Sequence, residues 1–194
     1  GQRCSALRLL FLPHETADLL IEGLTGAMRT LVIGDPADPR TDVGPVIDAA
    51  ARRALEAHVE RLARAARLHL RLPVPSEGCF FGPTLAEIPD AGFLQAEVFG
   101  PILHVVRYDP TRLVQAAAPL VATRYGLTLG VHSRIDSFAE AVRRAVPAGN
   151  TYINRSMIGA VVGVQPFGGE GLSGTGPKAG GPHALLRYAV ERAV

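Results

Sequence analysis

Apolar runs alternate with segments of helical periodicity along most of this chain. Residues 6–12 form an apolar run that stops at Pro13, and residues 102–108 and 127–132 are further runs of mainly apolar side chains. Strands that are separated by helices are joined by crossover connections and form a mainly parallel sheet. The alternation therefore predicts an α/β fold, a mainly parallel sheet with flanking helices, with residues 1–194 as one domain.

Helical periodicity is clearest after Asp48, which we expect to be the N-cap of a helix. The apolar residues that follow recur at helical spacing and share one face: Ala51, Leu55, Val59, Leu62 and Ala66. We expect Asp136 to cap another helix. Further helices are expected at residues 16–30, at 111–122 with an interruption at Pro119, and from Pro182 to the end.

The remaining strands are expected at residues 68–72, 80–88 and 150–154. Pro83 lies in the second of these and indicates an edge strand or an irregular start, because proline has no N–H for strand pairing. The stretch 159–181 is rich in glycine and shows no regular period.

Composition argues against several classes of partner. The chain has 20 Lys and Arg against 18 Asp and Glu, and no basic run clusters with aromatic residues, so we expect no nucleic acid partner. No apolar run approaches the roughly 18 residues of a membrane span, and no signal peptide opens the chain. Cys4 and Cys79 have neither C-x-x-C nor metal-ligand spacing. We therefore expect no metal site, no disulfide, and a reducing, cytoplasmic location.

Cys4 directly precedes the strand expected at residues 6–12, between Arg3 and Ser5. A lone cysteine is usually a small hydrophobic core residue. A thiol beside a cation and a small polar residue also suits a nucleophile, because the thiolate is the reactive form and positive charge favours it. Cys79 has no such neighbours and is expected to be structural.

Residues 97–101, Glu-Val-Phe-Gly-Pro, stand before the strand at 102–108. A glutamate at such a turn is usually a solvated loop charge. In a functional interpretation, the carboxylate of Glu97 accepts hydrogen bonds from ribose hydroxyls while Phe99 packs nearby.

The glycines of residues 159–169 allow backbone N–H groups to approach a ligand closely. They are a weak signal alone, since no G-x-x-x-x-G-K-[ST] pattern is present. Residues 172–176 are rich in turn formers and indicate no chemistry of their own.

Five blocks of sequence occur together in this order. They are Gly-Gln-Arg-Cys-Ser-Ala-Leu-Arg at 1–8, Thr-Asp-Val-Gly-Pro-Val-Ile-Asp at 41–48, Glu-Val-Phe-Gly-Pro at 97–101, Tyr-Gly-Leu-Thr-Leu-Gly-Val-His at 125–132 and Val-Gly-Val-Gln-Pro-Phe-Gly-Gly-Glu-Gly-Leu-Ser-Gly-Thr-Gly-Pro-Lys-Ala-Gly-Gly-Pro at 162–182. Together they resemble the aldehyde dehydrogenase superfamily over nearly the whole chain. The resemblance narrows to the L-glutamate γ-semialdehyde (1-pyrroline-5-carboxylate) dehydrogenases, and is closest to the C-terminal half of the bifunctional proline utilization A proteins.

The resemblance implies a role for each candidate residue. Cys4 matches the nucleophile that forms a thiohemiacetal with a small aldehyde, passes hydride to NAD and leaves a thioester for hydrolysis. The backbone N–H of Cys4 would help to hold the oxyanion. The other matches are Glu97 and Phe99 at the cofactor, and Ser5, Gly159, Ala160, Phe167 and Arg3 at the substrate.

These substrate contacts have a chemical reason. Backbone N–H and hydroxyl donors at Ser5, Gly159 and Ala160 suit the α-carboxylate of the substrate, because charge-assisted hydrogen bonds are strong. Arg3 would add positive charge, and Phe167 would pack on the methylene chain.

The resemblance also implies parts that this sequence does not contain. In the family a dinucleotide-binding domain precedes the nucleophile and carries the general-base glutamate and the asparagine of the oxyanion hole. An oligomerisation strand follows the final helix. We therefore expect a piece of a larger NAD(P)-dependent homo-oligomer whose upstream proline dehydrogenase domain, where present, would hold FAD. Alone, these 194 residues are expected to be inactive.

Two alternatives stay open. The first is a related dehydrogenase that acts on another semialdehyde. The second is a non-catalytic structural or interaction module that kept the fold and lost the chemistry.

Overall fold

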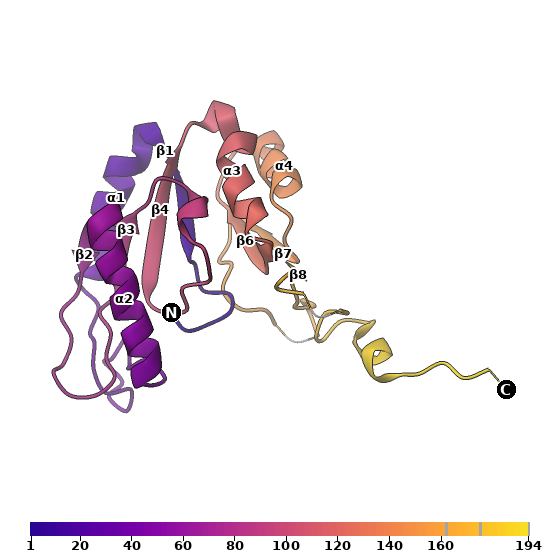
Figure 1. Ribbon diagram of the computed structural model, residues 1–194. Coiled ribbons are helices and arrows are strands. Elements are labelled where there is room, and N and C mark those ends of the chain that lie inside the picture. Colours follow the sequence, from indigo (N-terminus) through magenta and orange to yellow (C-terminus); the bar gives the residue numbers. More distant parts are fainter. Residues whose placement is uncertain (162, 175, 194) are drawn as a thin grey trace. The chain divides into compact units, whose positions relative to one another are not determined.

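The computed structural model describes residues 1–161, 163–174 and 176–193. The chain forms two compact units, Gly1–Arg112 and Leu113–Val194, each with its own strands and helices (Figure 1). The expected α/β class is confirmed. The single domain over residues 1–194 stays a prediction, since one domain can contain more than one compact unit.

The first unit is built on a four-stranded sheet in the order β1-β4-β3-β2. The strands are β1 (Leu9–Pro13), β4 (Ile102–Tyr108), β3 (Thr84–Glu87) and β2 (Arg67–Arg71). β4 runs parallel to both β1 and β3, and only β2 is antiparallel to its neighbour. The sheet is therefore mainly parallel, as the sequence predicts.

The two expectations for Pro83 have different outcomes. β3 begins at Thr84, so the irregular start is confirmed. The edge position is wrong, because β3 lies between β4 and β2. Proline is tolerated here because pairing starts one residue later, while the Pro83 carbonyl still accepts a hydrogen bond from the N–H of Leu72 at 3.1 Å.

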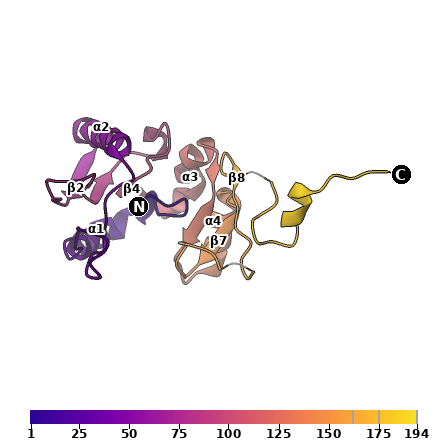
Figure 2. The same cartoon turned by 90° about the horizontal axis from the view of Figure 1, so that it is seen from below.

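Helices α1 (His14–Met28) and α2 (Ala49–Ala65) cover opposite faces of this sheet, as both views show (Figures 1 and 2). Successive residues of a strand point to opposite faces. Accordingly Leu85 packs with the buried residues of α1, and the next residue, Ala86, packs with those of α2. The two helices thus cover two separate apolar cores on one sheet.

The start of α2 follows the sequence prediction. The Asp48 side chain accepts a hydrogen bond from the N–H of Ala51 at 2.7 Å and so caps the helix. The expected apolar face is buried at Leu55, Val59 and Leu62.

The second unit has shorter elements. Strands β6 (Thr128–Val131) and β7 (Asn150–Ile153) pair in parallel, and β5 (Tyr125–Gly126) and β8 (Glu170–Gly171) pair antiparallel. Its helices are α3 (Leu113–Ala122) and α4 (Asp136–Ala145). The expected interruption at Pro119 is wrong, because α3 continues through this residue. A short 3₁₀ turn occurs in this unit at Ala184–Tyr188, and two others occur in the first unit at Ala91–Phe93 and Pro110–Arg112.

Two further expectations for the second unit are wrong. Asp136 is the first residue of α4 and not its N-cap; Ile135 holds that position, and the hydroxyl of Ser133 accepts its N–H at 3.0 Å. The helix expected from Pro182 to the end is only the 3₁₀ turn, and its apolar side chains are exposed. A short helix that buries no face is not stable in water, which explains the difference.

Three residues of the predicted segments lie outside the described residues. They are Val162 and Thr175 in the glycine-rich stretch and Val194 in the expected terminal helix.

Candidate active site

Cys4 lies in a tight turn directly before β1. The turn is closed by a hydrogen bond from the N–H of Ala6 to the carbonyl of Arg3 at 3.2 Å. The Cys4 thiol is exposed, whereas Ser5 beside it is buried at 5% exposure. Arg3 is exposed. The turn therefore presents the thiol to solvent on a short segment that is fixed from both sides.

The Glu97 loop lies next to this turn. β1 and β4 pair in parallel, so the segments that precede them in the chain meet at the same end of the sheet. The side-chain amide of Gln2 donates to the carbonyl of Phe99 at 3.3 Å and accepts from the N–H of Ile47 at 2.8 Å. Sheet topology thus brings together Cys4, Glu97 and Phe99, three residues that the sequence predicts for one site.

Arg8 connects the turn and the loop, and the sequence analysis gave it no role. Its guanidinium donates to the carbonyl of Gly1 at 2.7 Å and to that of Arg3 at 2.9 Å. It also stacks on the Phe99 ring, with 4.9 Å from Cζ to the ring centroid. Its Nε lies 3.8 Å from Oε1 of Glu97. The available signal was that Arg8 is the single charged residue of the apolar run 6–12.

The surroundings of Arg8 act on its charge in opposite directions. Burial lowers the pKa of the guanidinium, while Glu97 and Cys4 raise it. Cys4 is therefore near enough to the guanidinium of Arg8 to interact with it electrostatically.

A pair of histidines, buried His104 and half-buried His58, supports the backbone of Arg8. His104 on β4 is fully buried, and both its N–H, at 2.9 Å, and its Nδ1, at 3.0 Å, contact the carbonyl of Arg8. Its Nε2 lies 2.9 Å from Nε2 of His58. A carbonyl only accepts, so Nδ1 of His104 carries the proton and Nε2 of His104 accepts from His58.

This arrangement requires a neutral His104, because a protonated imidazole has no nitrogen left to accept a hydrogen bond. Burial lowers the pKa of His58 and of His104 to about 4. The charges of Arg61 and, for His104, of Arg8 act in the same direction.

The remaining predicted residues, Gly159, Ala160 and Phe167, belong to the second unit. Gly159 is exposed with a φ of 77°, a backbone conformation that favours glycine, and its carbonyl accepts from the hydroxyl of Tyr152 at 3.4 Å. Ala160 and Phe167 are half-buried, and Phe167 forms an isolated β-bridge with Ala179. These residues therefore lie in segments without regular secondary structure, between β7 and the 3₁₀ turn at Ala184–Tyr188.

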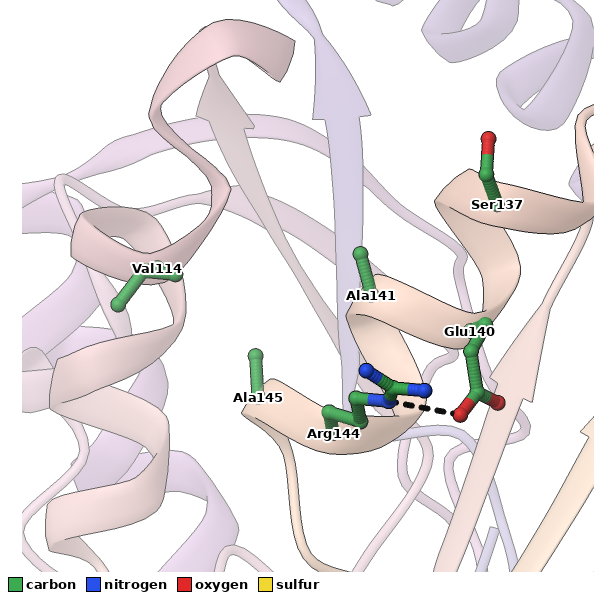
Figure 3. Close-up of a pocket in the computed structure, with 6 residues that line it drawn as sticks. All are labelled: Val114, Ser137, Glu140, Ala141, Arg144 and Ala145. Carbon is green, nitrogen blue, oxygen red and sulfur yellow. Dashed lines mark hydrogen bonds and ion pairs between the residues drawn. The ribbon is translucent and has the colours of Figure 1, made fainter.

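A hollow of about 560 Å³ in the second unit contains none of the predicted residues. Val114 of α3 and residues of α4 line it (Figure 3): Ser137, Glu140, Ala141, Arg144 and Ala145. The carboxylate of Glu140 is already paired with Arg143 at 2.7 Å and with Arg144 at 2.8 Å. These ion pairs leave the described lining of the hollow without a free carboxylate, and we assign the hollow no chemistry.

The described part of the chain offers neither a membrane-spanning helix nor a metal-binding cluster. No helix there has both the length and the apolar character needed to cross a membrane. The same residues contain no group of three or more His, Cys, Asp or Glu side chains that could hold a metal ion.

Comparisons with known proteins agree on one family. A model of the Aldehyde dehydrogenase family matches residues 1–194. The chain is 50% identical over 200 aligned residues to the bifunctional protein PutA of Escherichia coli (strain K12). The alignment covers 99% of this chain and 15% of that protein.

Solved structures give the same result. A crystal structure of proline utilization A from Bradyrhizobium japonicum matches 99% of this chain and 20% of its own, with a TM-score of 0.95 and 60% identity. A 1-pyrroline-5-carboxylate dehydrogenase from Thermus, solved with bound NAD, matches 93% of this chain and 35% of its own, with a TM-score of 0.84 and 38% identity. The chain thus spans between 15% and 35% of the length of these proteins.

Proposed function

Because the chain belongs to the aldehyde dehydrogenase family, we propose that it carries the nucleophile of an NAD-dependent enzyme that oxidises L-glutamate γ-semialdehyde to L-glutamate in proline catabolism. The observation that carries this proposal is the exposed thiol of Cys4, which Arg8 and Gln2 tie to the loop of Glu97 and Phe99. The names of the similar proteins, PutA and 1-pyrroline-5-carboxylate dehydrogenase, support the substrate class.

In the proposed reaction the Cys4 thiolate attacks the aldehyde carbon. A sulfur–carbon bond forms, and the carbonyl oxygen becomes the oxyanion of a thiohemiacetal, which the backbone N–H of Cys4 stabilises. When bound, NAD supplies the acceptor for the hydride that leaves this carbon. Water then adds to the resulting thioester, releases the carboxylic acid and restores the thiol.

Glu97 and Phe99 fit a nicotinamide ribose. The Glu97 side chain is 39% exposed and Phe99 is 42% exposed, so a carboxylate acceptor and an aromatic ring are both open to a ligand. Ribose hydroxyls donate well to a carboxylate, because such hydrogen bonds are charge-assisted. The residues present therefore suit the proposed role in cofactor binding.

For the substrate, we propose an anchor that recognises the α-carboxylate. The hydroxyl of Ser5 and the N–H groups of Gly159 and Ala160 are its donors, and Arg3 adds positive charge. Phe167 packs on the methylene chain. The positive φ of Gly159 supports this role, because glycine exposes backbone N–H groups that a side chain would cover elsewhere.

Most of the NAD contacts and the base that activates water are proposed to come from outside the 194 residues. The PutA relative from Escherichia coli extends far beyond the matched segment, which makes up 15% of its length. A purified polypeptide of these residues alone is therefore expected to produce no NADH. We likewise propose that the working enzyme is a homo-oligomer.

The test uses the full translation product of the gene that encodes this chain. With NAD and L-glutamate γ-semialdehyde, NADH absorbance is expected to increase, and an aliphatic aldehyde of equal length that lacks the α-amino acid group should react with a much lower kcat/KM. Equal values for the two aldehydes would argue for another substrate.

Labelling of Cys4 distinguishes the non-catalytic alternative. Iodoacetamide should alkylate Cys4 faster than Cys79, and prior addition of NAD should change the rate at Cys4 only. Equal rates at the two cysteines, without any effect of NAD, would favour a module that has lost the chemistry.

A further inference from the structure

We propose that Arg8 is a positioning residue that aligns the Glu97 carboxylate with the Cys4 turn. This rests on the proposed function, in which Glu97 binds the cofactor ribose and Cys4 is the nucleophile. The Arg8 side chain contacts both the backbone of the Cys4 turn and the Phe99 ring, and it lies close to the carboxylate of Glu97.

The donors of the guanidinium are divided between these contacts. Its two terminal nitrogens donate to the carbonyls of Gly1 and Arg3. Nε is the remaining nitrogen of the guanidinium; it is buried, and its N–H forms no hydrogen bond with any group that the structure describes. Buried N–H groups without an acceptor are rare in native proteins. The nearest carboxylate is that of Glu97, whose Oε1 lies 3.8 Å away.

The distance from Nε of Arg8 to Oε1 of Glu97 is too long for a hydrogen bond, but a small movement of the carboxylate would form one. Charge-assisted N–H to carboxylate bonds are about 2.8 Å long, so Oε1 would have to approach by roughly 1 Å. The Glu97 side chain is 39% exposed and can make this movement. One carboxylate oxygen then accepts from Arg8, and the other is left for the ribose hydroxyls.

The base of the Arg8 side chain is fixed, so the guanidinium can serve as a reference point. Its backbone carbonyl accepts two hydrogen bonds from His104, and its side chain is only 16% exposed. Stacking on Phe99 further restricts the planar group. Lysine has neither the planar fork nor three directed donors at these positions, so it could not replace these contacts.

The test uses the full gene product with Arg8→Lys. Loss of the Nε–H and of stacking leaves Glu97 and Phe99 without a fixed position. We expect KM for NAD, and the Kd of NADH measured by fluorescence, to rise roughly tenfold, the loss of about one charge-assisted hydrogen bond. KM for the aldehyde should change less than about twofold, since that substrate makes no proposed contact with Glu97.

Arg107→Lys is the matched control. Arg107 also lies on the sheet of the first unit, is 18% exposed, and pairs with Glu87 at 2.8 Å and with Asp18 at 2.7 Å. Its replacement should lower the melting temperature without changing KM for NAD. A double variant, Arg8→Lys with Glu97→Gln, should lose clearly less NADH affinity than the sum of the two single losses, because both changes remove the alignment of Glu97 and only Arg8→Lys also releases Phe99.

Each outcome decides the proposal. If Arg8→Lys only lowers the melting temperature, as in Arg107→Lys, or if its effect adds fully to that of Glu97→Gln, Arg8 is a structural residue and the proposal is overturned. If the wild-type protein does not oxidise the semialdehyde but binds NADH, the proposed substrate is wrong, and the NADH measurements still decide the role of Arg8. If the wild-type protein binds no NADH, both proposals fail.

Discussion

The two units differ in how their candidate residues are held. In the first unit a four-stranded sheet has an apolar core on each face, and Cys4 and Glu97 lie on short segments that are tied to it. In the second unit the strands are four residues or shorter, and Gly159 lies on an exposed loop. The proposed chemistry of bond making thus belongs to a packed scaffold, whereas the proposed recognition of the carboxylate depends on an exposed loop in addition to Ser5. Loops tolerate change that a packed scaffold does not.

The largest expected difference concerns activity. In the full gene product, Cys4→Ala removes the proposed nucleophile and should lower kcat for semialdehyde oxidation by at least about a thousandfold. The rate of NADH formation measures this loss. The melting temperature should stay close to that of the wild type, because the Cys4 side chain is exposed.

Cys79→Ala is the matched substitution for this test. Cys79 is half-buried and packs against the core under α2, so its replacement should cost about 1 kcal/mol of stability and leave kcat unchanged. Reversed effects of the two substitutions would show that the nucleophile is misassigned.

Packing should give the next largest difference between the units. Leu62 on α2 is fully buried, so Leu62→Ala should lower the free energy of unfolding by about 3 kcal/mol. The same substitution at Leu129, which is half-buried on β6, should cost about 1 kcal/mol because less apolar surface is lost. Urea unfolding of both variants measures the two values. Equal losses would mean that the second unit is as well packed as the first.

How much the sequence predicts also differs between the units. The bounds of β4 and the N-cap Asp48 were predicted correctly, because both depend on local patterns: an apolar run between turn residues, and an acidic residue before a helical repeat. The terminal helix was not, because whether a helix persists depends on the surface it packs against. Sequence patterns do not contain that information.

The residues of the candidate site were also only partly predicted from the sequence. Cys4, Glu97 and Phe99 could be chosen by residue type and motif, and the structure brings these three together. Arg8 could not, because its role depends on the pairing of β1 with β4, two strands that are far apart in the chain. A charged residue in an apolar run shows that a partner exists but not which one it is.

The histidine pair should make the first unit more sensitive to acid than the second. The pKa of His58 and of His104 in the folded protein is about 4, below the ordinary value of 6.5. Between these values the unfolded chain binds more protons than the folded one. The stabilisation is therefore complete above pH 6.5 and is lost as the pH falls toward 4, with a slope of up to about 1.4 kcal/mol per pH unit for each histidine.

Urea unfolding at several pH values measures this slope. In the His104→Leu variant the dependence between pH 6.5 and 4 should become shallower, because the buried imidazole and its interaction with His58 are gone. An unchanged slope in that variant would place the acid sensitivity elsewhere in the chain.

The smallest effect is expected at the proposed anchor in the second unit. Gly159 has a φ of 77°, and a Cβ at this position would meet no atom within 4 Å. Gly159→Ala should therefore cost only about 1 kcal/mol in backbone strain, without steric conflict. Because the substitution moves the N–H groups proposed to bind the α-carboxylate, KM for the semialdehyde should rise about tenfold with little change in kcat.

Gly163 provides the control for backbone strain. Its φ is 79°, and a Cβ there would likewise meet no atom within 4 Å, so Gly163→Ala carries the same strain four residues further along the loop. It should leave KM for the semialdehyde unchanged if Gly159 binds the carboxylate directly. If both alanine variants raise KM equally, the loop acts through its general flexibility and the anchor is not at Gly159. If neither does, recognition of the carboxylate belongs to Ser5 and the packed first unit, and the division of roles between the two units is wrong.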